Sequence, residues 1–543
     1  MTLYEDATEY HWLDYSTNGA KVVEVKDDGT DYKGEFKLLD FQLHDLAKLV
    51  KNDYAAIGSE MGTGKTHEGI ALWEFWRIPD LPSLVVAPLN THSSWLEKFR
   101  MQAPHAKVLV IDRQDRDEII MDILRQDHDV YIVHWQGLRL MPYLVKFKFG
   151  VIIGDEIHRI SNRDAKVTIA FKQLKTVYKL AMSGTMSGDK PDQMWSVLNW
   201  LQPETFPSYW GFRQQYCIES TGYGGYRSII GVKNTDELHR LMEPFYVRHL
   251  KKSQCCPDHP NGVMPWLKDK TYDTIEVELN AKQRRVYDEM DQAMVAWIGE
   301  QQDTPLVAAV VIAKLNRLNS IALATPRIDV STKFRRNPMY DLWKQVMDEE
   351  GEEGLKRAGF WNDRSGTVRV ENPLIEEKVS EVNLELPSSK IDAVKELILD
   401  SNGKQFVVFS SSKKVLYLAK QVLNEAGITA EVFSGDTNQR MRDAIIPAFQ
   451  DGDIQVFLGV IAAVGEGVDG LQHATDTMIF LDRSWSARDN KQAEDRLHRG
   501  GQKNSVQIID VIAKDTRDAG RHQHLELKWS WIKEMMGDKR GIR

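Results

Sequence analysis

The stretch SEMGTGKT at residues 59–66 contains a glycine-rich turn that decides the fold of the first half of the chain. A strand-like apolar run at 55–58 precedes it, and a helix-forming stretch at 66–76 follows it. Gly62 and Gly64 allow the backbone to turn sharply, so that its N–H groups can face the oxygens of a phosphate. A strand, such a loop and a helix in this order predict a nucleotide-binding α/β domain, because the helix directs its positive end at the same anion.

The residues after the second glycine predict the phosphate and metal ligands. Lys65 would neutralise the β and γ phosphates of a nucleoside triphosphate, and the hydroxyl of Thr66 would bind Mg²⁺. The strict phosphate-loop pattern has glycine where this chain has Ser59, but the shorter form, small-x-x-Gly-x-Gly-Lys-Thr, fits. A glycine-rich turn without catalytic meaning is the alternative, and the flanking strand and helix argue against it.

The segment GDEIH at 154–158 places two carboxylates at the end of the apolar run 151–153. An acidic residue that ends a buried strand beside a phosphate loop is the usual partner of magnesium, which predicts this role for Asp155. Glu156 can polarise the attacking water as a general base. Either carboxylate alone could instead cap the next helix. Taken together with the phosphate loop, the segment predicts hydrolysis of a nucleoside triphosphate.

The segment QAEDRLHRGGQ at 492–502 predicts a second set of phosphate ligands. The spacing of Gln492, Arg496 and Arg499 would put all three on one face of a helix. Two planar guanidinium groups on one stripe suit the charge that builds up on a phosphate during transfer. A surface helix with salt bridges is the alternative interpretation.

A shorter motif, SGT at 183–185, follows a strand-like run and would read as a turn if it stood alone. Its position after the acidic strand predicts that it couples the state of the γ-phosphate to the second half of the chain. His158 could form a hydrogen bond across to this motif.

Short apolar runs alternate with helical stretches in both halves of the chain. The predicted strands are 55–58, 84–87, 108–111, 130–133, 151–154 and 178–182, and then 406–410, 430–433, 456–458, 478–481 and 506–512. The predicted helices are 66–76, 92–100, 116–126, 164–174 and 191–201, and then 389–400, 413–426, 437–450, 487–498 and 518–536. Uniformly apolar strands that alternate with helices indicate parallel sheets covered on both faces. We therefore predict an α/β fold of two tandem parallel-sheet lobes.

These patterns also predict the domain boundaries. We expect an N-terminal extension at 1–36, a first lobe at 37–250, a linker at 251–272, and a second lobe at 273–543 with a helical or irregular insertion at 327–386. Two helices are expected before this insertion, at 280–299 and 305–324, and an aromatic helix within 524–543 is expected to pack on the second lobe. The insertion could be a subdomain or a mobile excursion, and its sequence leaves both possibilities open.

Composition excludes several classes of protein. The chain has 543 residues, too many for one core, and its net charge of −9 does not exclude nucleic-acid binding, which depends on local fields. Three cysteines argue against a disulfide framework and for a reducing compartment. Cys255, Cys256 and His259 are too few ligands for a zinc site, so a plain loop is favoured. We find neither a secretion signal nor an apolar run of about 18 residues, so no membrane partner is expected.

These motifs, in this order, resemble those of superfamily-two helicases with a DEAH-type acidic motif, and specifically those of the Swi/Snf branch. The resemblance covers about 38–326 and 388–515. It extends to LLDFQLHDL at 38–46, VVAPLNTHSSWLEKF at 85–99, MSGTMSGDKPDQMWSVLNWLQPETFPSY at 182–209, VRHLKKSQ at 247–254, VELNAKQRRVYDEM at 277–290 and VFSGDTNQRMRDAIIPAFQ at 432–450. It implies two RecA-like lobes, with ATP and Mg²⁺ as cofactors, and little beyond the motor itself.

The resemblance also implies the roles of individual residues. The catalytic set would be Lys65, Asp155, Glu156, Arg496 and Arg499, and Thr66 and Asp155 would hold Mg²⁺. The nucleotide would contact Gln42, which reads adenine in the family, and Gly62, Thr63, Gly64, Lys65, Thr66, Gly467, Asp469 and Gln492. The chain departs from the family pattern at Ser59, usually aspartate, at Asp469, usually asparagine, and at Gly500, usually isoleucine.

The function that this resemblance implies is ATP-driven movement along double-stranded DNA, with remodelling of DNA or protein–DNA complexes. Phosphate contacts are expected from Pro88, Asn90, Thr91, Ser410, Ser411, Gly435 and Gly459. A strand-separating or branch-migrating helicase is one alternative. A nucleotide-dependent DNA-binding protein without turnover is another. A motor with so little added to it suggests a bacterial or viral source and a cytoplasmic location, or a nuclear one in a eukaryote.

Overall fold

The computed structural model describes residues 37–538 except for 112–115, 222–226, 254–258, 294, 299–303, 308–310, 363–366, 369–372 and 466–467. Contacts between residues divide the chain into two units. The first contains Met1–Val277 and Ala393–Arg543, and the second contains Glu278–Asp392. The N-terminal extension that the sequence predicts at 1–36 lies outside the described residues.

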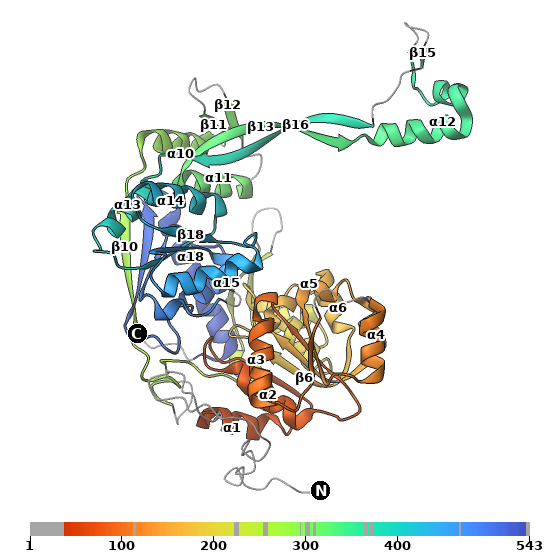
Figure 1. The fold of residues 1–543 in the computed structure, drawn as a ribbon, viewed down its shortest axis with the longest axis vertical. Coiled ribbons are helices and arrows are strands. Elements are labelled where there is room, and N and C mark those ends of the chain that lie inside the picture. Colours follow the sequence, from red (N-terminus) through yellow and green to blue (C-terminus); the bar gives the residue numbers. More distant parts are fainter. Residues whose placement is uncertain are drawn as a thin grey trace. The chain divides into compact units, whose positions relative to one another are not determined.

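Lobe 1, defined here as residues 37–250, is built on a seven-stranded sheet (Figure 1). Its strands lie in the order β3-β4-β2-β5-β6-β1-β9, and all neighbouring strands are parallel. The strands are β1 (Tyr54–Ile57), β2 (Ser83–Ala87), β3 (Val108–Val110), β4 (Val130–His134), β5 (Lys148–Asp155), β6 (Lys175–Met182) and β9 (Tyr246–Val247). A separate antiparallel pair is formed by β7 (Cys217–Thr221) and β8 (Arg227–Val232).

Helices connect the strands of lobe 1. They are α1 (Asp40–Leu49), α2 (Lys65–Trp76), α3 (His92–Gln102), α4 (Arg116–Arg125), α5 (Trp135–Leu138), α6 (Lys166–Lys172), α7 (Met194–Leu201), α8 (Tyr209–Tyr216) and α9 (Thr235–Met242). Short 3₁₀ helices lie at η3 (Leu89–Thr91), η4 (Pro142–Lys146), η5 (Ile157–Ile160) and η6 (Pro191–Gln193).

The central strands of this sheet are buried on both faces. Leu84 and Val86 of β2 belong to one buried apolar cluster, whereas Val85 and Ala87 belong to another. Successive side chains of a strand point to opposite faces, so each face of the sheet carries its own core. This double burial explains why the strands read as continuous apolar runs in the sequence, and it confirms the predicted parallel sheet.

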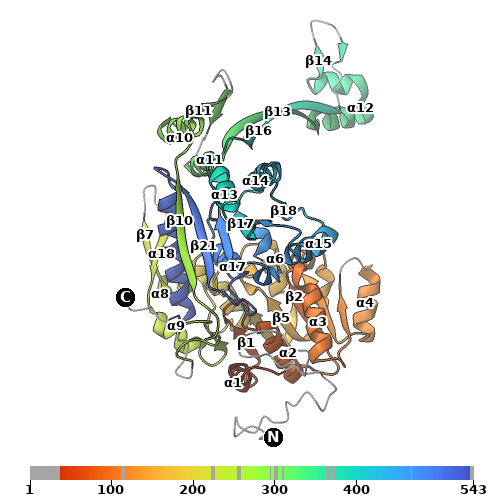
Figure 2. The same cartoon turned by 60° about the vertical axis from the view of Figure 1, so that its left-hand side comes forward.

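Lobe 2, defined here as residues 270–277 and 393–538, is built on a six-stranded parallel sheet (Figure 2). Its order is β10-β21-β20-β17-β19-β18, with β10 (Lys270–Val277), β17 (Phe406–Ser410), β18 (Ala430–Phe433), β19 (Val456–Val460), β20 (Thr477–Phe480) and β21 (Val506–Ala513). Its helices are α13 (Ser389–Leu399), whose part from Ala393 on lies in this range, α14 (Lys413–Glu425), α15 (Gln439–Gln450), α16 (Ile461–Val464), η8 (Leu471–His473), α17 (Ala487–Glu494) and α18 (Asp518–Met536). The fold class predicted from the sequence is therefore confirmed.

Because β10 begins at Lys270, the stretch between the lobes ends slightly before residue 272, where the sequence placed the end of the linker.

The second unit differs from the sequence prediction at two helices. The predicted helix 280–299 ends early as α10 (Ala281–Ala293), and the predicted helix 305–324 begins late as α11 (Val311–Leu323). Between them β11 (Val295–Ile298) and β12 (Thr304–Val307) pair as antiparallel strands, so their backbone groups bond across the pair and not along a helix. Strands are consistent with the β-branched and aromatic content of these short segments.

The segment predicted as an insertion forms a ribbon that carries a helix. β13 (Thr325–Arg336) pairs antiparallel with β16 (Leu374–Glu385) over their whole lengths. Between these strands lie α12 (Pro338–Arg357), β14 (Trp361–Asn362) and β15 (Thr367–Val368). The described part of this segment is thus regular structure, although the sequence left its nature open.

The last helix, α18, packs against both lobes. The sequence had predicted that it packs on lobe 2 alone. Its residues Trp529 and Ile532 form a buried cluster with Ala487 of lobe 2. One helical turn further, Met535 belongs to the core of lobe 1, and the Glu534 carbonyl oxygen lies 2.9 Å from Nε2 of His239. Sequence alone could not show this, because apolar residues surround the helix instead of forming one stripe.

Among the described residues, no helix is both long enough and apolar enough to cross a membrane.

Gly459 and Gly435 offer a matched test of packing in lobe 2. A Cβ atom on Gly459 would lie 2.7 Å from Val464 and 2.8 Å from the ring of Phe409, whereas one on Gly435 would meet nothing within 4 Å. We expect Gly459→Ala to lower the free energy of unfolding by about 1–3 kcal/mol through overpacking. Gly435→Ala should change it by less than about 0.5 kcal/mol. Urea unfolding of both variants measures the difference, and equal stabilities would contradict the packing described here.

Candidate functional site

The phosphate loop has the backbone conformation that the sequence predicted. Gly62 and Gly64 have φ angles of 82° and 88°, in the left-handed region that favours glycine. Gly64 is the residue directly before α2, so the loop leads into the start of that helix. The hydroxyl of Thr63 donates to the carbonyl oxygen of Glu60 at 2.8 Å, which closes the turn. The N-terminus of α2 is therefore presented to the space above the loop, as an anion site requires.

Lys65 lies within this loop with its amine buried. Its Nζ donates to the carbonyl oxygens of Ser59 at 2.9 Å and Glu60 at 3.0 Å. Burial lowers the pKa of Lys65 to about 8, while the nearby carboxylates of Glu156 and Asp155 act in the opposite direction. The amine therefore stays mostly protonated at neutral pH, as a ligand of phosphate oxygens must.

Gln42 supports the phosphate loop from α1. Its Nε2 donates to the carbonyl oxygens of Thr63 at 3.2 Å and Gly64 at 3.3 Å, and its Oε1 accepts the N–H of Leu39 at 2.9 Å. A Cβ atom on Gly64 would lie only 2.7 Å from this amide nitrogen. The amide thus braces the loop at a point where only glycine fits. Contact of Gln42 with adenine stays a prediction.

Asp155 and Glu156 follow β5 directly and differ in environment. Asp155 accepts the indole N–H of Trp95 at 2.9 Å, and burial together with the charge of Glu156 raises the pKa of Asp155 to about 6. Burial acts in the same direction on Glu156, but His158, Lys65 and Ser183 outweigh it and lower the pKa of Glu156 to about 2. So low a pKa suits a carboxylate that orients the attacking water better than one that removes its proton.

Ser183 joins the acidic segment to the SGT motif. Its Oγ donates to Oε2 of Glu156 at 2.9 Å, and Nδ1 of His158 lies 3.0 Å from the same hydroxyl. The N–H of Thr185 donates to that hydroxyl oxygen at 3.1 Å. The predicted hydrogen bond from His158 to this motif is confirmed. The motif therefore touches the carboxylate predicted to act on water.

Arg499 of lobe 2 lies directly against the phosphate loop of lobe 1. A Cβ atom on Gly62 would lie 3.2 Å from Cβ of Arg499. The guanidinium of Arg499 forms an ion pair with Asp469 at 3.0 Å. Arg496 is buried nearby, where its Nη1 donates to the carbonyl oxygen of Val468 at 2.8 Å. Burial lowers the pKa of Arg496 to about 10, and the charge of Arg499 adds to this effect.

The structure corrects one detail of this arginine motif. The sequence predicts a helix over 487–498, with Gln492, Arg496 and Arg499 on one face, but α17 ends at Glu494. After that point the backbone tightens, and the N–H of Arg496 donates to the carbonyl oxygen of Ala493. The two arginines therefore lie on turns after the helix, and only Gln492 lies on the helix itself.

Two further basic residues lie near the site, although no role was predicted for them from the sequence; they fall within the segments 85–99 and 247–254 that resemble the family. Lys98 of α3 is close enough to Arg499 and Asp155 for their charges to affect it, and burial lowers its pKa. Arg248 donates to the carbonyl oxygen of Gly184 at 2.9 Å and pairs through two nitrogens with the carboxylate of Asp538, at 2.8 and 2.9 Å. These contacts join segments that lie far apart in the sequence.

Of the residues predicted for the site, Gly62 of lobe 1 lies against Arg499 of lobe 2, which pairs with Asp469. Thr66 lies in the first turn of α2, and Asp469 accepts the N–H of Gly470 at 2.7 Å in the loop beside Arg499. Gly467 lies outside the described residues, as do Cys255 and Cys256.

The site fits ATP and magnesium. The two left-handed glycines leave room at the loop that a side chain would fill. No group of three or more His, Cys, Asp or Glu side chains able to hold a metal is found in the described part of the chain. Thr66 and Asp155 stay the predicted ligands of Mg²⁺, which proteins usually bind through one or two side chains together with substrate phosphates.

The residues predicted to contact DNA phosphates divide into two groups. Asn90 in lobe 1 accepts a hydrogen bond from Nη1 of Arg442 in lobe 2 at 2.7 Å, and Nη2 of the same arginine donates to the carbonyl oxygen of Gly435 at 3.2 Å. The hydroxyl of Thr91 donates to the Pro88 carbonyl oxygen at 2.8 Å.

The residues of the second group contact other residues of lobe 2. Ser410 donates to Asp482 at 2.5 Å, and the backbone N–H of Ser411 donates to the same carboxylate at 3.0 Å. Gly459 lies inside β19, where its partners in the sheet are Phe409 and Phe433. A DNA contact at Gly459 is therefore not supported by its surroundings.

Two family models match the chain. The model of the SNF2-related domain matches residues 46–323, and the model of the helicase conserved C-terminal domain matches residues 389–501. The chain belongs to the SNF2-related family. This confirms the predicted Swi/Snf resemblance, and it places the chain in a family of helicase-type ATPases.

Two curated relatives and one solved structure illustrate the similarity. Transcription regulatory protein SNF2 of Saccharomyces cerevisiae is 24% identical over 495 residues, which are 88% of this chain and 26% of that protein. ATP-dependent helicase FUN30 of the same yeast is 26% identical over 547 residues, 93% of this chain and 47% of that protein. The chain thus spans less than half the length of either relative. The SWI2/SNF2 ATPase core of Sulfolobus solfataricus in complex with dsDNA is 20% identical, with a TM-score of 0.38, and the match covers 95% of this chain and 96% of that chain.

The hydrogen bond to Asp155 predicts how activity depends on pH. Because the pKa of Asp155 is about 6, ATP hydrolysis should fall as the pH drops through 6 and protonation removes the magnesium ligand. Trp95→Phe removes the N–H that stabilises the carboxylate, so the acidic limb of kcat/KM should move to higher pH. Trp135→Phe is the matched control, because that indole donates to the backbone carbonyl of Asp155. An unmoved limb in Trp95→Phe would contradict the assigned role of Asp155.

Proposed function

We propose that the chain is an ATP-dependent translocase on double-stranded DNA, which couples ATP hydrolysis to movement and to remodelling of DNA or protein–DNA complexes. The contact of Arg499 with Gly62 carries the proposal, since it places an arginine of lobe 2 over the phosphate loop of lobe 1. A site completed by two lobes is one whose chemistry depends on their relative position. The family match supports the same function.

The residues of the site divide the work of hydrolysis. Lys65 and the N–H groups of the loop hold the phosphates of the substrate, and Glu156 orients the water that attacks the γ-phosphorus. Arg496 and Arg499 stabilise the charge that develops as the bond to ADP breaks. When bound, Mg²⁺ supplies charge neutralisation between the phosphates. Ser183 links Glu156 to the SGT motif, so nucleotide status can reach the lobe interface.

Arg442 supports the proposed binding of DNA. It binds both Asn90 of lobe 1 and Gly435 of lobe 2, so these two predicted phosphate contacts lie next to each other. Contacts of this kind position a motor on the backbone of DNA and carry no sequence information. Closure around ATP would then change the distance between the two grips.

Two alternatives make different predictions. A strand-separating or branch-migrating helicase would unwind forked or branched DNA, and a nucleotide-dependent binding protein would not turn over. The presence of Lys65, Asp155, Glu156 and Arg499 argues against the second alternative.

An ATPase assay with no DNA, single-stranded DNA or duplex DNA tests the proposal. We expect strong stimulation by duplex DNA and no unwinding of forks. Lys65→Ala should abolish turnover, and Arg499→Ala should lower kcat by about 10³-fold or more while ATP still binds. Unwinding of forks would favour the helicase alternative, whereas absence of hydrolysis in the wild type would favour the binding protein. A normal rate in Arg499→Ala would refute the assignment across the lobes.

The role of Arg442 can be measured by DNA binding at several salt concentrations. Arg442→Ala should weaken binding to all duplex sequences alike and lower the slope of log K against log salt, because the side chain that holds the predicted phosphate contacts Asn90 and Gly435 next to each other is lost. Arg240→Ala, an exposed arginine on α9, is the matched control and should leave the slope unchanged. A slope that Arg442→Ala leaves unaltered would mean that this part of the lobes does not hold DNA.

A further inference from the structure

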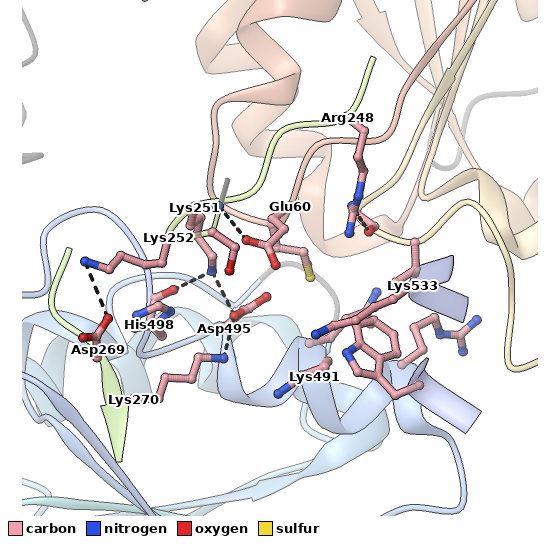
Figure 3. A pocket seen from close by; sticks show the side chains of 17 residues that line it. Glu60, Arg248, Lys251, Lys252, Asp269, Lys270, Lys491, Asp495, His498 and Lys533 are labelled. Atoms are coloured by element: carbon pink, nitrogen blue, oxygen red, sulfur yellow. Dashed lines mark hydrogen bonds and ion pairs between the residues drawn. The ribbon is translucent and has the colours of Figure 1, made fainter. Parts of the chain in front are cut away.

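A cavity of about 300 Å³ lies between the two lobes, beside the phosphate loop. Glu60 and Met61 of the loop line it, whereas the residues from Gly62 to Thr66 do not. The opposite wall comes from α17 and α18 of lobe 2 (Figure 3). The cavity is therefore a space separate from the cradle above the loop, although the two share the loop as a common wall.

Three contacts connect this cavity with the reaction centre. Thr185, which lines it, donates its N–H to Ser183, and Ser183 donates to Glu156. The carbonyl oxygen of Glu60 accepts a hydrogen bond from the amine of Lys65. Groups that would surround the γ-phosphate are thus at most one residue from the cavity wall.

The walls of the cavity are basic. Seven lysine or arginine side chains line it, against the three carboxylates of Glu60, Asp269 and Asp495. Most of these cations are paired: Lys251 and Lys270 both donate to Asp495, at 2.9 and 3.1 Å (Figure 3). The paired groups fix the shape of the wall and offer little attraction to a ligand.

Two donors at the cavity are not matched in this way. No carboxylate among the described residues lies within ion-pair distance of Lys533, which lines the cavity together with Lys491 (Figure 3). Gln492 is 4% exposed, and within the described chain its Nε2 has no hydrogen-bond acceptor. A buried amide nitrogen without a partner is costly, so a ligand with acceptor oxygens would stabilise the site. Arg488 adds a further cation on the same wall.

We propose that this cavity binds the inorganic phosphate that hydrolysis releases, and that it is the route by which phosphate leaves the closed site. The inference rests on the proposed ATPase function. A phosphate dianion presents four oxygens, which suits an unpaired ammonium and an unpaired amide donor. Charge-assisted bonds at the cavity would draw phosphate away from Lys65 while ADP is still held in the loop.

Binding of inorganic phosphate to the full chain tests the site without any need for turnover. With ADP and Mg²⁺ present, a titration followed by phosphorus NMR should show binding to the wild-type protein. Lys533→Glu should weaken this binding by about tenfold, and Lys533→Gln by less, because a charge-assisted bond is lost. Lys528→Gln is the matched control, since Lys528 lies on the same helix but does not line the cavity. Circular dichroism confirms that each variant is folded.

A single-turnover experiment tests the route. Acid quench measures formation of phosphate, and a fluorescent phosphate-binding protein measures its release. Release should lag behind formation several-fold more in Lys533→Glu than in wild type or Lys528→Gln. No phosphate binding by the wild type, or equal binding and release in all variants, would overturn the inference. Phosphate binding that depends on Lys533 in a protein that hydrolyses no ATP would refute the proposed function and the exit role, and leave only an anion site.

Discussion

The approach of Arg499 to Gly62 is the contact on which the rest of the arrangement depends. A glycine-rich loop alone can bind a phosphate, and an arginine on a turn alone can pair with any anion. Placed against each other from two lobes, they surround one small space with fixed donors. Glycine is required at this contact for two reasons, since φ is positive and a Cβ atom would press on the arginine.

The acidic segment shows how burial and neighbours give adjacent carboxylates different properties. Asp155 and Glu156 are next to each other in sequence, yet the pKa of the first is raised and that of the second is lowered. Burial and the neighbouring like charge would together raise the pKa of both carboxyl groups, so neither would ionise readily. His158 and Ser183 lower the pKa of Glu156, and the hydrogen bond from Trp95 partly offsets the rise in the pKa of Asp155. The hydrogen-bond partners therefore set the charge state of the site.

Two buried basic side chains bind carboxylates and backbone carbonyl groups from both lobes. Arg248 reaches Gly58 before the phosphate loop and Gly184 in the SGT motif, and it is held by Asp538 at the end of the last helix. Lys251 reaches Asp495 and the carbonyl oxygen of His498 in lobe 2. Charged groups buried in this way must be paired, so movement of one lobe would have to exchange these partners together.

The sequence by itself determined the two parallel-sheet lobes and predicted the residues of the nucleotide site. Strands such as β2 are buried on both faces, so their composition carries the signal, and the phosphate loop is a local feature that needs only its own glycines. Lys98, Arg248 and Arg442 fall within segments that resemble the family, but residue spacing in those segments does not show which basic side chain reaches the site. The helix predicted at 487–498 also ran past Glu494, where α17 ends, because residue spacing cannot show where a helix tightens into turns. Only the tertiary structure brought these side chains to the lobe interface, because contacts between residues hundreds of positions apart depend on how the sheets and the last helix pack.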